Sequence, residues 1–333
     1  MDMESTSNKV LAYRHIKEPA TEILRYINDR RKGIINSLMT RWSKFNRQCM
    51  GGIEPNAIYT IAGISGCGKS AFINSLETDL FDMNPHANFV VLSFTFEMLS
   101  SKQVGRKLSY RLKKTTSELY SGTGDVRAKL TDSDYLELVK ESEKLEKYPI
   151  YYVDCPGTVE EIRNTIIDFY YKPEIKGKWL IIMLDHTLLT KGKNGEKERE
   201  TLFSLQRLFM EFKKYGKNTI IQLSQMNREI EDKDRIMNQA FHFPVRRDIF
   251  GGDSVYQASD YVIVLHRPEL LGIENGKYGL GNWPVENLIY MHFLKVREGE
   301  PKILVFENNL KYNSIEEYNP SNIKQIKENK NDN

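Results

Sequence analysis

Stretches of apolar residues alternate with stretches of helical periodicity from about residue 57 to residue 293. The apolar runs predict strands at 57–62, 88–94, 150–153, 179–184, 219–223, 261–265 and 288–293. The stretches between them repeat apolar residues every three or four positions and predict helices at 69–79, 101–114, 132–147, 159–170 and 196–215. Apolar strands that alternate with helices are typical of a parallel sheet covered on both faces. The pattern therefore predicts the α/β class, with a mostly parallel, twisted sheet.

The two ends of the chain differ from this central part. Residues 17–32 predict an amphipathic helix that ends before Gly33, with Ala20, Ile23, Leu24 and Ile27 on its apolar face. Such a helix either packs on its own domain or docks on a neighbouring subunit. After about Tyr318 the chain is rich in Asn and Lys, which predicts a disordered tail. We therefore expect an arm and linker helix in residues 1–45, one α/β domain in residues 46–318 and a tail in residues 319–333.

The composition narrows the classes of function. With 333 residues, 40% hydrophobic and 28% charged, the chain can bury the core of an ordinary globular protein. No apolar run reaches the length of about 18 residues that a membrane span needs, and the N-terminus lacks the apolar stretch of a signal peptide. A net charge of +3 does not by itself indicate nucleic-acid binding. Because Cys49, Cys67 and Cys155 are too scattered for a disulfide framework or a zinc site, we expect a cytoplasmic protein.

The clearest chemical signal is a phosphate-binding loop. Residues 63–70 read Gly-Ile-Ser-Gly-Cys-Gly-Lys-Ser, which fits G-x-x-x-x-G-K-[ST] between a predicted strand and a predicted helix. The glycines let backbone N–H groups surround the β-phosphate, at a helix N-terminus that favours negative charge. Lys69 should reach the β- and γ-phosphates, and the Ser70 hydroxyl should ligate Mg²⁺. The sequence therefore predicts ATP and Mg²⁺ as cofactors, bound by Gly63, Ser65, Gly66, Cys67, Gly68, Lys69, Ser70 and Ala71.

Two acids follow other predicted strands. Asp185 ends the apolar run 179–184, as a Walker B carboxylate does, so we expect it to complete the magnesium site with Ser70. Glu97 is the only acid at the end of the strand 88–94. It is either the group that polarises the attacking water or a first-turn Glu that stabilises the following helix. Position alone leaves both readings open.

These blocks, in this order, resemble the C-terminal ATPase domain of the DnaB-type replicative helicases, within the RecA-like superfamily. The resemblance runs from about residue 18 to residue 301. Residues 93–98 resemble the family's S-L-E-M block, which implies that Glu97 is the catalytic base. Residues 223–228 resemble L-S-Q-L-N-R, which implies that Gln225 senses the γ-phosphate. The resemblance thus implies an ATP hydrolase with a RecA-like P-loop core, preceded by a linker helix.

A further block, Lys-Val-Arg-Glu-Gly at 295–299, matches the family's K-x-R-x-G. By this resemblance, Lys295 and Arg297 reach across a subunit interface and stabilise charge on the neighbour's ATP. The alternative is a pair of surface basic residues on one face of an edge strand. Fingers that act in trans imply a homo-oligomer, which in this family is a hexamer, with the linker helix packed on the adjacent subunit.

Two basic, loop-like segments are candidates for contact with single-stranded DNA, at 190–199 and 228–247. The second carries Arg228, Lys233, Arg235, Arg246 and Arg247. Our candidate DNA contacts are Lys191, Lys193, Arg228, Arg246 and Arg247. Because both segments also contain acids, plain solvated loops are the alternative.

The resemblance also has gaps. Only about 17 residues precede the predicted linker helix, where the family usually carries a collar domain, so docking of primase is not implied. Phe250 and Tyr256 replace an Arg and a Glu of the family pattern. The short, Lys- and Asn-rich form suggests a phage or mobile-element protein acting in a bacterial cytoplasm, with a primase, loader or polymerase as open partners.

The leading hypothesis is an ATP-dependent replicative helicase that translocates on single-stranded DNA as a ring. One alternative is a RecA- or KaiC-like ATPase that assembles on DNA or on itself without unwinding. The other is an adaptor that uses ATP occupancy as an assembly switch.

Overall fold

The computed structural model describes residues 13–121, 130–192 and 196–319, and it divides into two compact units, residues 1–37 and 38–333. The first unit contains α1 (Lys17–Arg31), in which Ile23, Leu24 and Ile27 are largely exposed. The second unit begins before the expected boundary at residues 45 and 46, because Trp42 and Phe45 are buried in its core. The predicted tail from residue 320 onward lies outside the described residues.

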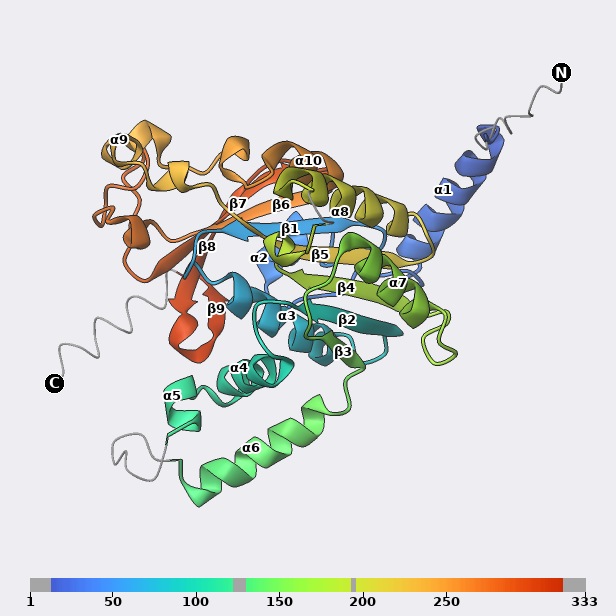
Figure 1. The fold of residues 1–333 in the computed structure, drawn as a ribbon, viewed down its shortest axis with the longest axis horizontal. Coiled ribbons are helices and arrows are strands. Elements are labelled where there is room, and N and C mark those ends of the chain that lie inside the picture. The colour runs from blue at the N-terminus through green and yellow to red at the C-terminus, as the bar shows by residue number, and fades with distance from the viewer. Residues whose placement is uncertain (1–12, 122–129, 193–195, 320–333) are drawn as a thin grey trace. The chain divides into compact units, whose positions relative to one another are not determined.

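In the described residues the second unit holds one nine-stranded sheet, in the order β3-β2-β4-β5-β1-β6-β7-β8-β9 (Figure 1). Its strands are β1 (Ile58–Gly63), β2 (Phe89–Thr95), β3 (Ile150–Val153), β4 (Trp179–Asp185), β5 (Asn218–Gln225), β6 (Tyr261–His266), β7 (Leu288–Val296), β8 (Ile303–Asn309) and β9 (Ser314–Glu317). The strands β1 to β6 pair in parallel, and β7, β8 and β9 add antiparallel strands beyond β6. The predicted mostly parallel α/β sheet is confirmed, and β8 and β9 extend it beyond the predicted strands.

Helices cover both faces of the sheet. They are α2 (Ser43–Gln48), α3 (Lys69–Met83), α4 (Ser100–Leu112), α5 (Thr116–Leu119), α6 (Asp132–Leu145), α7 (Val159–Tyr170), α8 (Glu198–Phe212), α9 (Lys233–Met237) and α10 (Gly252–Ala258). Alternate residues of β4 enter two separate cores: Ile181 packs in the cluster that includes Phe72 of α3. Leu180 packs in the other, with Ile166 of α7 and Leu205 of α8. Figure 1 shows α3 on one face and α7 and α8 on the other. No helix in the described residues is long and apolar enough to cross a bilayer.

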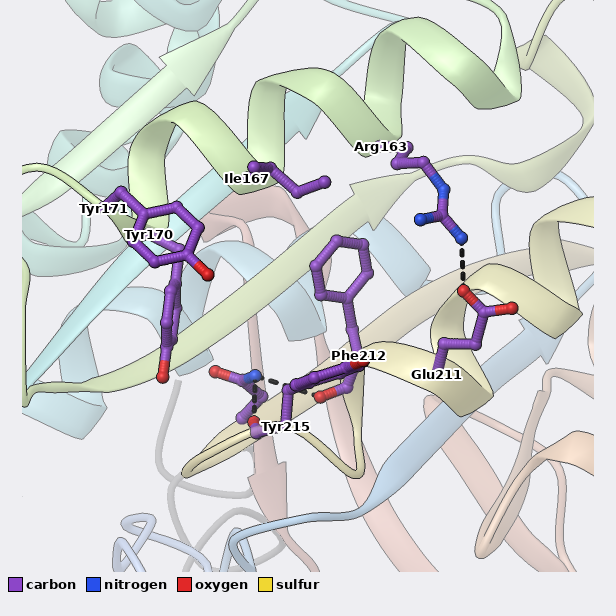
Figure 2. A pocket seen from close by; sticks show the side chains of 8 residues that line it. Arg163, Ile167, Tyr170, Tyr171, Glu211, Phe212 and Tyr215 are labelled. Carbon is purple, nitrogen blue, oxygen red and sulfur yellow. Dashed lines mark hydrogen bonds and ion pairs between the residues drawn. The ribbon is translucent and has the colours of Figure 1, made fainter. Parts of the chain in front are cut away.

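A small pocket of about 220 Å³ lies between α7 and the end of α8, beside the amino end of β5 (Figure 2). It is lined by Arg163, Ile167, Tyr170, Tyr171, Glu211, Phe212, Tyr215 and Asn218. Asn218 donates from Nδ2 to the carbonyls of Phe212 and Tyr215 and so satisfies the end of α8. Arg163 and Glu211 form an ion pair with each other at the rim. The lining is mainly aromatic and aliphatic, which does not match the charge of a triphosphate.

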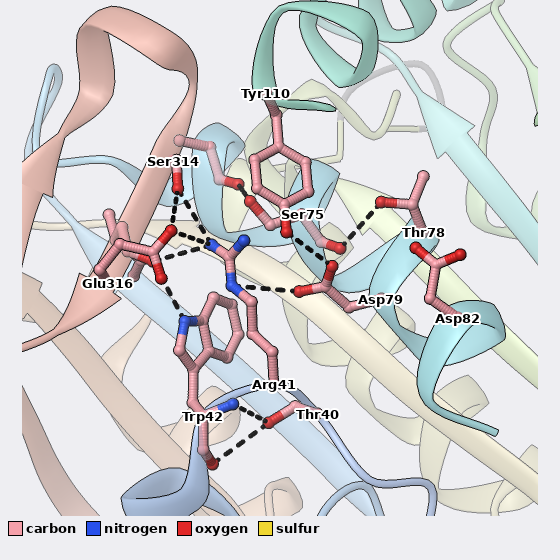
Figure 3. A network of polar contacts seen from close by, with 12 residues as sticks. Thr40, Arg41, Trp42, Ser75, Thr78, Asp79, Asp82, Tyr110, Ser314 and Glu316 are labelled. Carbon is pink, nitrogen blue, oxygen red and sulfur yellow. Dashed lines mark hydrogen bonds and ion pairs between the residues drawn. The ribbon is translucent and has the colours of Figure 1, made fainter. Parts of the chain in front are cut away.

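Arg41 joins segments that are far apart in the sequence (Figure 3). Its guanidinium lies 5.0 Å from the ring centroid of Trp42 and 4.4 Å from that of Tyr110. Its Nε forms an ion pair of 3.3 Å with Asp79 of α3, and its NH2 donates to the carbonyl of Ile315 in β9 at 2.8 Å. The Trp42 indole donates to the same carbonyl at 3.1 Å. The segment before α2, the P-loop helix and the last strand are therefore fastened at one point.

Asp79→Asn tests this network through its pH dependence. Burial raises the pKa of Asp79 from 3.8 to about 6, although the charge of Arg41 opposes the shift. The folded protein therefore holds this proton to a higher pH than the unfolded chain does. The stability that Asp79 contributes in its protonated form is lost as pH rises from about 4 to about 6, by up to about 3 kcal/mol. In urea unfolding at a series of pH values, the stability of Asp79→Asn should decline less over this range than that of wild type, while Asp253→Asn, at an exposed position, should decline as wild type does. Parallel profiles for Asp79→Asn and wild type would contradict the assignment.

Candidate active site

The carboxyl ends of four parallel strands bring the P-loop together with three predicted site residues, Glu97, Asp185 and Gln225. Thr95 of β2 pairs with Asp185 of β4, and the backbone N–H of Phe96 donates to the Asp185 carbonyl at 2.9 Å. Gly63 of β1 pairs with Gln225 of β5. The P-loop, the segment after β2, and the ends of β4 and β5 therefore lie at one edge of the sheet.

The P-loop is shaped by its glycines and by Lys69. Gly66 and Gly68 have φ angles of +76° and +104°, in the left-handed region that favours glycine. A Cβ on Gly63 would lie 2.3 Å from Cys67 Sγ, so the loop closes tightly over its first residue. Lys69 Nζ donates to the carbonyls of Gly63 at 2.7 Å and Ile64 at 2.9 Å. The ammonium group is thus held along the inside of the loop.

A pocket of about 390 Å³ opens beside this loop. It is lined by Ser65, Gly66, Gly68, Lys69, Ser70, Ala71, Glu97, Arg106, Gln225, Arg267, Leu310 and Asn313. Gly63 and Cys67, also predicted to bind the nucleotide, are not among the lining residues, and Cys67 is fully buried. The remaining predicted P-loop residues face the pocket directly.

The buried carboxylate of Asp185 has the properties of a metal ligand. Burial, followed by the nearby charge of Glu97, raises the pKa of Asp185 from 3.8 to about 6. Its Oδ1 is buried and has no hydrogen-bond partner among the described residues. Such an oxygen needs a partner, and a cation supplies one. In the described residues no cluster of three or more His, Cys, Asp and Glu could hold a metal. The Asp185 carboxylate and the Ser70 hydroxyl are oxygen ligands, the kind that Mg²⁺ prefers.

Glu97 lies in a short bend between β2 and α4, beside Asp185. Its side chain is 53% exposed, and its Oε2 lies 3.9 Å from His186 Nε2. The first turn of α4 contains no acid, since that helix begins at Ser100. The N-terminus of α4 is instead capped by Asp154, which accepts hydrogen bonds from Ser100 N at 2.8 Å and Ser100 Oγ at 2.9 Å. Glu97 therefore does not stabilise the first turn of α4, and its carboxylate lines the pocket beside the P-loop.

Gln225 connects the pocket to the segment that follows β5. Its Oε1 lies 3.5 Å from Lys69 Nζ, and its carbonyl accepts the backbone N–H of Phe250 at 3.0 Å. The next residues continue this pairing: Asn227 N donates to the Asp248 carbonyl at 2.6 Å. The backbone of Gln225, whose side chain lies beside Lys69, is thus hydrogen-bonded to the residues that directly follow the basic segment 228–247.

Two arginines in the pocket escaped the sequence analysis. Arg267 directly follows β6 and donates to the carbonyl of Gly66 in the P-loop at 3.0 Å. Arg267 could have been predicted from the sequence, because it follows an apolar run just as Asp185 does. Arg106 comes from the middle of α4, and its charge acts to lower the pKa of Asp185. No local motif marks Arg106, because only the packing of α4 brings it to the pocket.

The P-loop lies at the carboxyl ends of the parallel strands, whereas Lys295 and Arg297 lie at the opposite ends, where β6 begins. They stand at the end of β7, which runs antiparallel to β6, and β8 flanks β7, so β7 is not an edge strand. Lys295 Nζ donates to the carbonyl of Tyr256 at 2.7 Å, and Arg297 Nε lies 2.6 Å from Asp260 Oδ1. The six residues of β1 alone span about 20 Å from the start of that strand to the P-loop that follows it. Neither side chain can therefore reach the pocket of its own subunit in this conformation.

The candidate DNA segments are only partly loop-like. The segment 228–247 contains the short helices Arg228–Glu231, Lys233–Met237 and Gln239–Phe241, in place of the expected irregular stretch. Arg235, one of its basic residues, is buried in a two-bond ion pair with Asp248 at 2.6 and 2.7 Å, so it is a structural residue. Such a buried pair holds the segment together and cannot follow phosphates.

The structure describes four of the five candidate DNA contacts. The side chains of Lys191, Arg228, Arg246 and Arg247 are exposed. Arg246 forms an ion pair of 2.6 Å with Asp253. Lys193 lies outside the described residues.

Comparisons with known proteins agree with this geometry. A family model described as "DnaB-like helicase C terminal domain" matches residues 37–316. A solved structure of an isolated ATPase domain has a TM-score of 0.74 at 17% identity, with 92% of this chain and 100% of that chain covered. "The Structure Of A DnaB-Like Replicative Helicase And Its Interactions With Primase" has a TM-score of 0.72 at 17% identity, with 92% and 68% covered. At this identity the likeness shows the fold, which confirms the RecA-like prediction. No curated protein matches the chain in sequence.

The three cysteines should differ sharply in reactivity. Burial raises the pKa of the Cys67 thiol, and burial also raises that of Cys49, whereas Cys155 is exposed. Because the thiolate is the reactive form, an aromatic disulfide reagent should modify one thiol rapidly in the native protein. Cys155→Ser should abolish that rapid phase, and modification of wild type should leave nucleotide binding intact. A rapid phase that persists in Cys155→Ser and is slowed by ATP would place the reactive thiol in the P-loop instead.

Proposed function

Because this chain belongs to the DnaB-like helicase C-terminal domain family, we propose that it is an ATP-driven helicase that moves on single-stranded DNA as a ring-shaped oligomer. One observation carries the proposal. Lys69, Glu97 and Asp185 meet at one edge of the sheet, while Lys295 and Arg297 stand at the other. A complete set of catalytic groups then requires two subunits.

Within one subunit, the residues of the pocket divide the work of hydrolysis. Lys69 and the backbone N–H groups of the P-loop bind the triphosphate. Glu97, which faces the pocket from a fixed bend, accepts the proton of the attacking water. Bound between Ser70 and Asp185, Mg²⁺ would supply positive charge to the phosphate oxygens. Gln225, beside Lys69, is placed to detect whether the γ-phosphate is present.

Arg106 and Arg267 add positive charge on two further sides of this pocket. Both come from elements that differ from the P-loop, namely α4 and the end of β6. Charges fixed in place before the reaction stabilise developing negative charge without reorganisation. We assign these two arginines to binding of the nucleotide in the same subunit.

In the proposed oligomer, Lys295 and Arg297 enter the neighbour's pocket and stabilise charge on its γ-phosphate. A contact that joins one side of a subunit to the other side of the next is heterologous, and such contacts form a ring if the rotation between subunits closes and a helical filament if it does not. We propose a hexamer, as in the family. The exposed apolar face of α1, with Ile23, Leu24 and Ile27, is the proposed dock on an adjacent subunit.

Nucleotide state would reach DNA through the backbone pairing at the end of β5. Gln225 and Asn227 are hydrogen-bonded to Phe250 and Asp248, so a shift of the sensor moves the basic segment with it. The exposed Lys191, Arg228, Arg246 and Arg247 are the proposed contacts with DNA phosphates, and binding should weaken as salt rises. A loader, a primase or a polymerase would be the protein partners in a cytoplasmic replication complex.

The two alternatives keep the ATP site and change its use. A RecA- or KaiC-like ATPase would hydrolyse ATP and assemble, but would not separate strands. An ATP-switched adaptor would need nucleotide binding and not turnover. The presence of Glu97 in the pocket favours an enzyme that turns over ATP, since an assembly switch could dispense with a catalytic base.

The first test compares ATP hydrolysis with and without single-stranded DNA, while light scattering follows the oligomer mass. We expect DNA to stimulate hydrolysis. Arg297→Ala should lower turnover at least about 1000-fold, the effect typical of losing an arginine finger, with the oligomer retained. Arg207→Ala, at an exposed arginine of α8, is the matched control and should behave as wild type. A monomer whose rate ignores DNA would remove the motor proposal for the isolated chain.

Glu97→Gln separates a motor from a switch. The amide keeps the size of the side chain but cannot take a proton, so turnover should fall by about 100-fold or more. Binding of ATP and nucleotide-dependent assembly should survive, because Glu97 does not bind the phosphates. Strand displacement that continues at the wild-type rate in Glu97→Gln would show that another group is the base.

A further inference from the structure

Asp260 links three parts of the subunit at the edge opposite the P-loop. Its carboxylate accepts hydrogen bonds from Lys213 Nζ at 2.6 and 2.8 Å, and from the backbone N–H of Ile58 at 2.8 Å. The same carboxylate forms an ion pair with Arg297, with Nε 2.6 Å from Oδ1. Its backbone pairs with both neighbours as well: Asp260 N donates to the Ile58 carbonyl, and Arg297 N donates to the Asp260 carbonyl. The start of β1, the end of α8 and the end of β7 therefore meet at one acid.

Burial distinguishes the two members of the ion pair. The side chain of Asp260 is only 7% exposed, whereas that of Arg297 is 50% exposed. The acid is thus anchored in the protein, and the arginine extends from it toward solvent. A guanidinium held through Nε still has two terminal nitrogens, which together can bind a phosphate in bidentate fashion.

The two finger residues are held in different ways. Lys295 Nζ is bonded to the carbonyls of Tyr256 and Gln257 at the end of α10, and it must leave them to contact a neighbour. Arg297 needs no such release, because Asp260 holds the inner side of its guanidinium only. Without the carboxylate, Arg297 would lose its anchor and would face the charge of Lys213 unscreened.

We propose that Asp260 is a positioning residue for Arg297, which holds the guanidinium extended toward the ATP of the next subunit. The inference rests on the proposed function, since it assigns a support to the finger that acts in trans. Pre-ordering a long side chain in its working geometry lowers the cost of placing it in the transition state. Misplacement by about 1 Å can cost about 100-fold in rate. Asp260 should therefore affect turnover in the neighbouring site and not in its own.

The test uses the full chain with Asp260→Asn, which keeps an oxygen to accept the Ile58 N–H but removes the charge. We expect kcat for DNA-stimulated hydrolysis to fall by about 10- to 100-fold, with KM for ATP changed by less than about threefold. Asp82→Asn, which removes the charge from another short Arg–Asp pair, with Arg111, is the matched control and should retain the wild-type kcat. Asp260→Glu, which keeps the charge but moves it, should give an intermediate loss and serves if Asp260→Asn fails to fold.

Mixed oligomers then show in which subunit Asp260 acts. Co-assembly of Asp260→Asn with Lys69→Ala creates interfaces with an intact ATP site on one side and an intact finger on the other. Hydrolysis should exceed the sum of the two separate preparations, as it should for Arg297→Ala mixed with Lys69→Ala. If the Arg297→Ala mixture recovers and the Asp260→Asn mixture does not, Asp260 is not the support of the finger and the inference is wrong. If Arg297→Ala has no effect at all, the proposed trans-acting mechanism is itself wrong.

Discussion

Backbone hydrogen bonds between neighbouring parallel strands set Thr95 opposite Asp185 and Gly63 opposite Gln225. Parallel strands end at the same edge of a sheet, so every side chain that follows one of them is delivered to the same place. The P-loop, the buried carboxylate of Asp185 and the side chain of Gln225 are close together for this reason. The register of the sheet therefore sets the geometry of the site. A slip of one residue in the pairing of β2 or β4 would turn the side chains of that strand to the other face of the sheet.

The reversal of direction after β6 has the opposite effect. Because β7 runs antiparallel to β6, its end lies at the far edge, with Lys295 and Arg297 about one strand length from the P-loop. The same sheet thus separates two sets of groups that the proposed reaction requires together. Lys295 and Arg297 are too far from the P-loop of their own subunit to complete its site. In the proposed ring, activity therefore requires assembly. Asp260 stands where this far edge meets the beginning of β1, the strand that carries the P-loop at its other end.

The sequence identified most of this arrangement because its signals are local. Seven strands are continuous apolar runs, and Glu97, Asp185 and Gln225 each follow one of them. In contrast, β9 is short and rich in Glu, so it does not stand out as an apolar run. The start of β8, residues 303–306, is an apolar run that the predicted strands do not include. Arg106 reaches the pocket only through the packing of α4, and Arg235 reads as a surface basic residue until its distant carboxylate partner is known. What the sequence could not supply is the pairing of residues remote in the chain, which depends on the finished fold.

The fastening of Arg41 and Trp42 to the carbonyl of Ile315 carries a consequence for how the chain is made. A ribosome releases the P-loop and its helix long before it releases β9. Until β9 emerges, the buried indole N–H of Trp42 lacks its acceptor and Arg41 lacks its carbonyl ligand, both of which are costly to leave unmet. The segment before α2 and strand β9 therefore form a clasp that can close only after β9 has left the ribosome. Synthesis of the chain in order from its N-terminus thus makes the packing of Trp42 a late event.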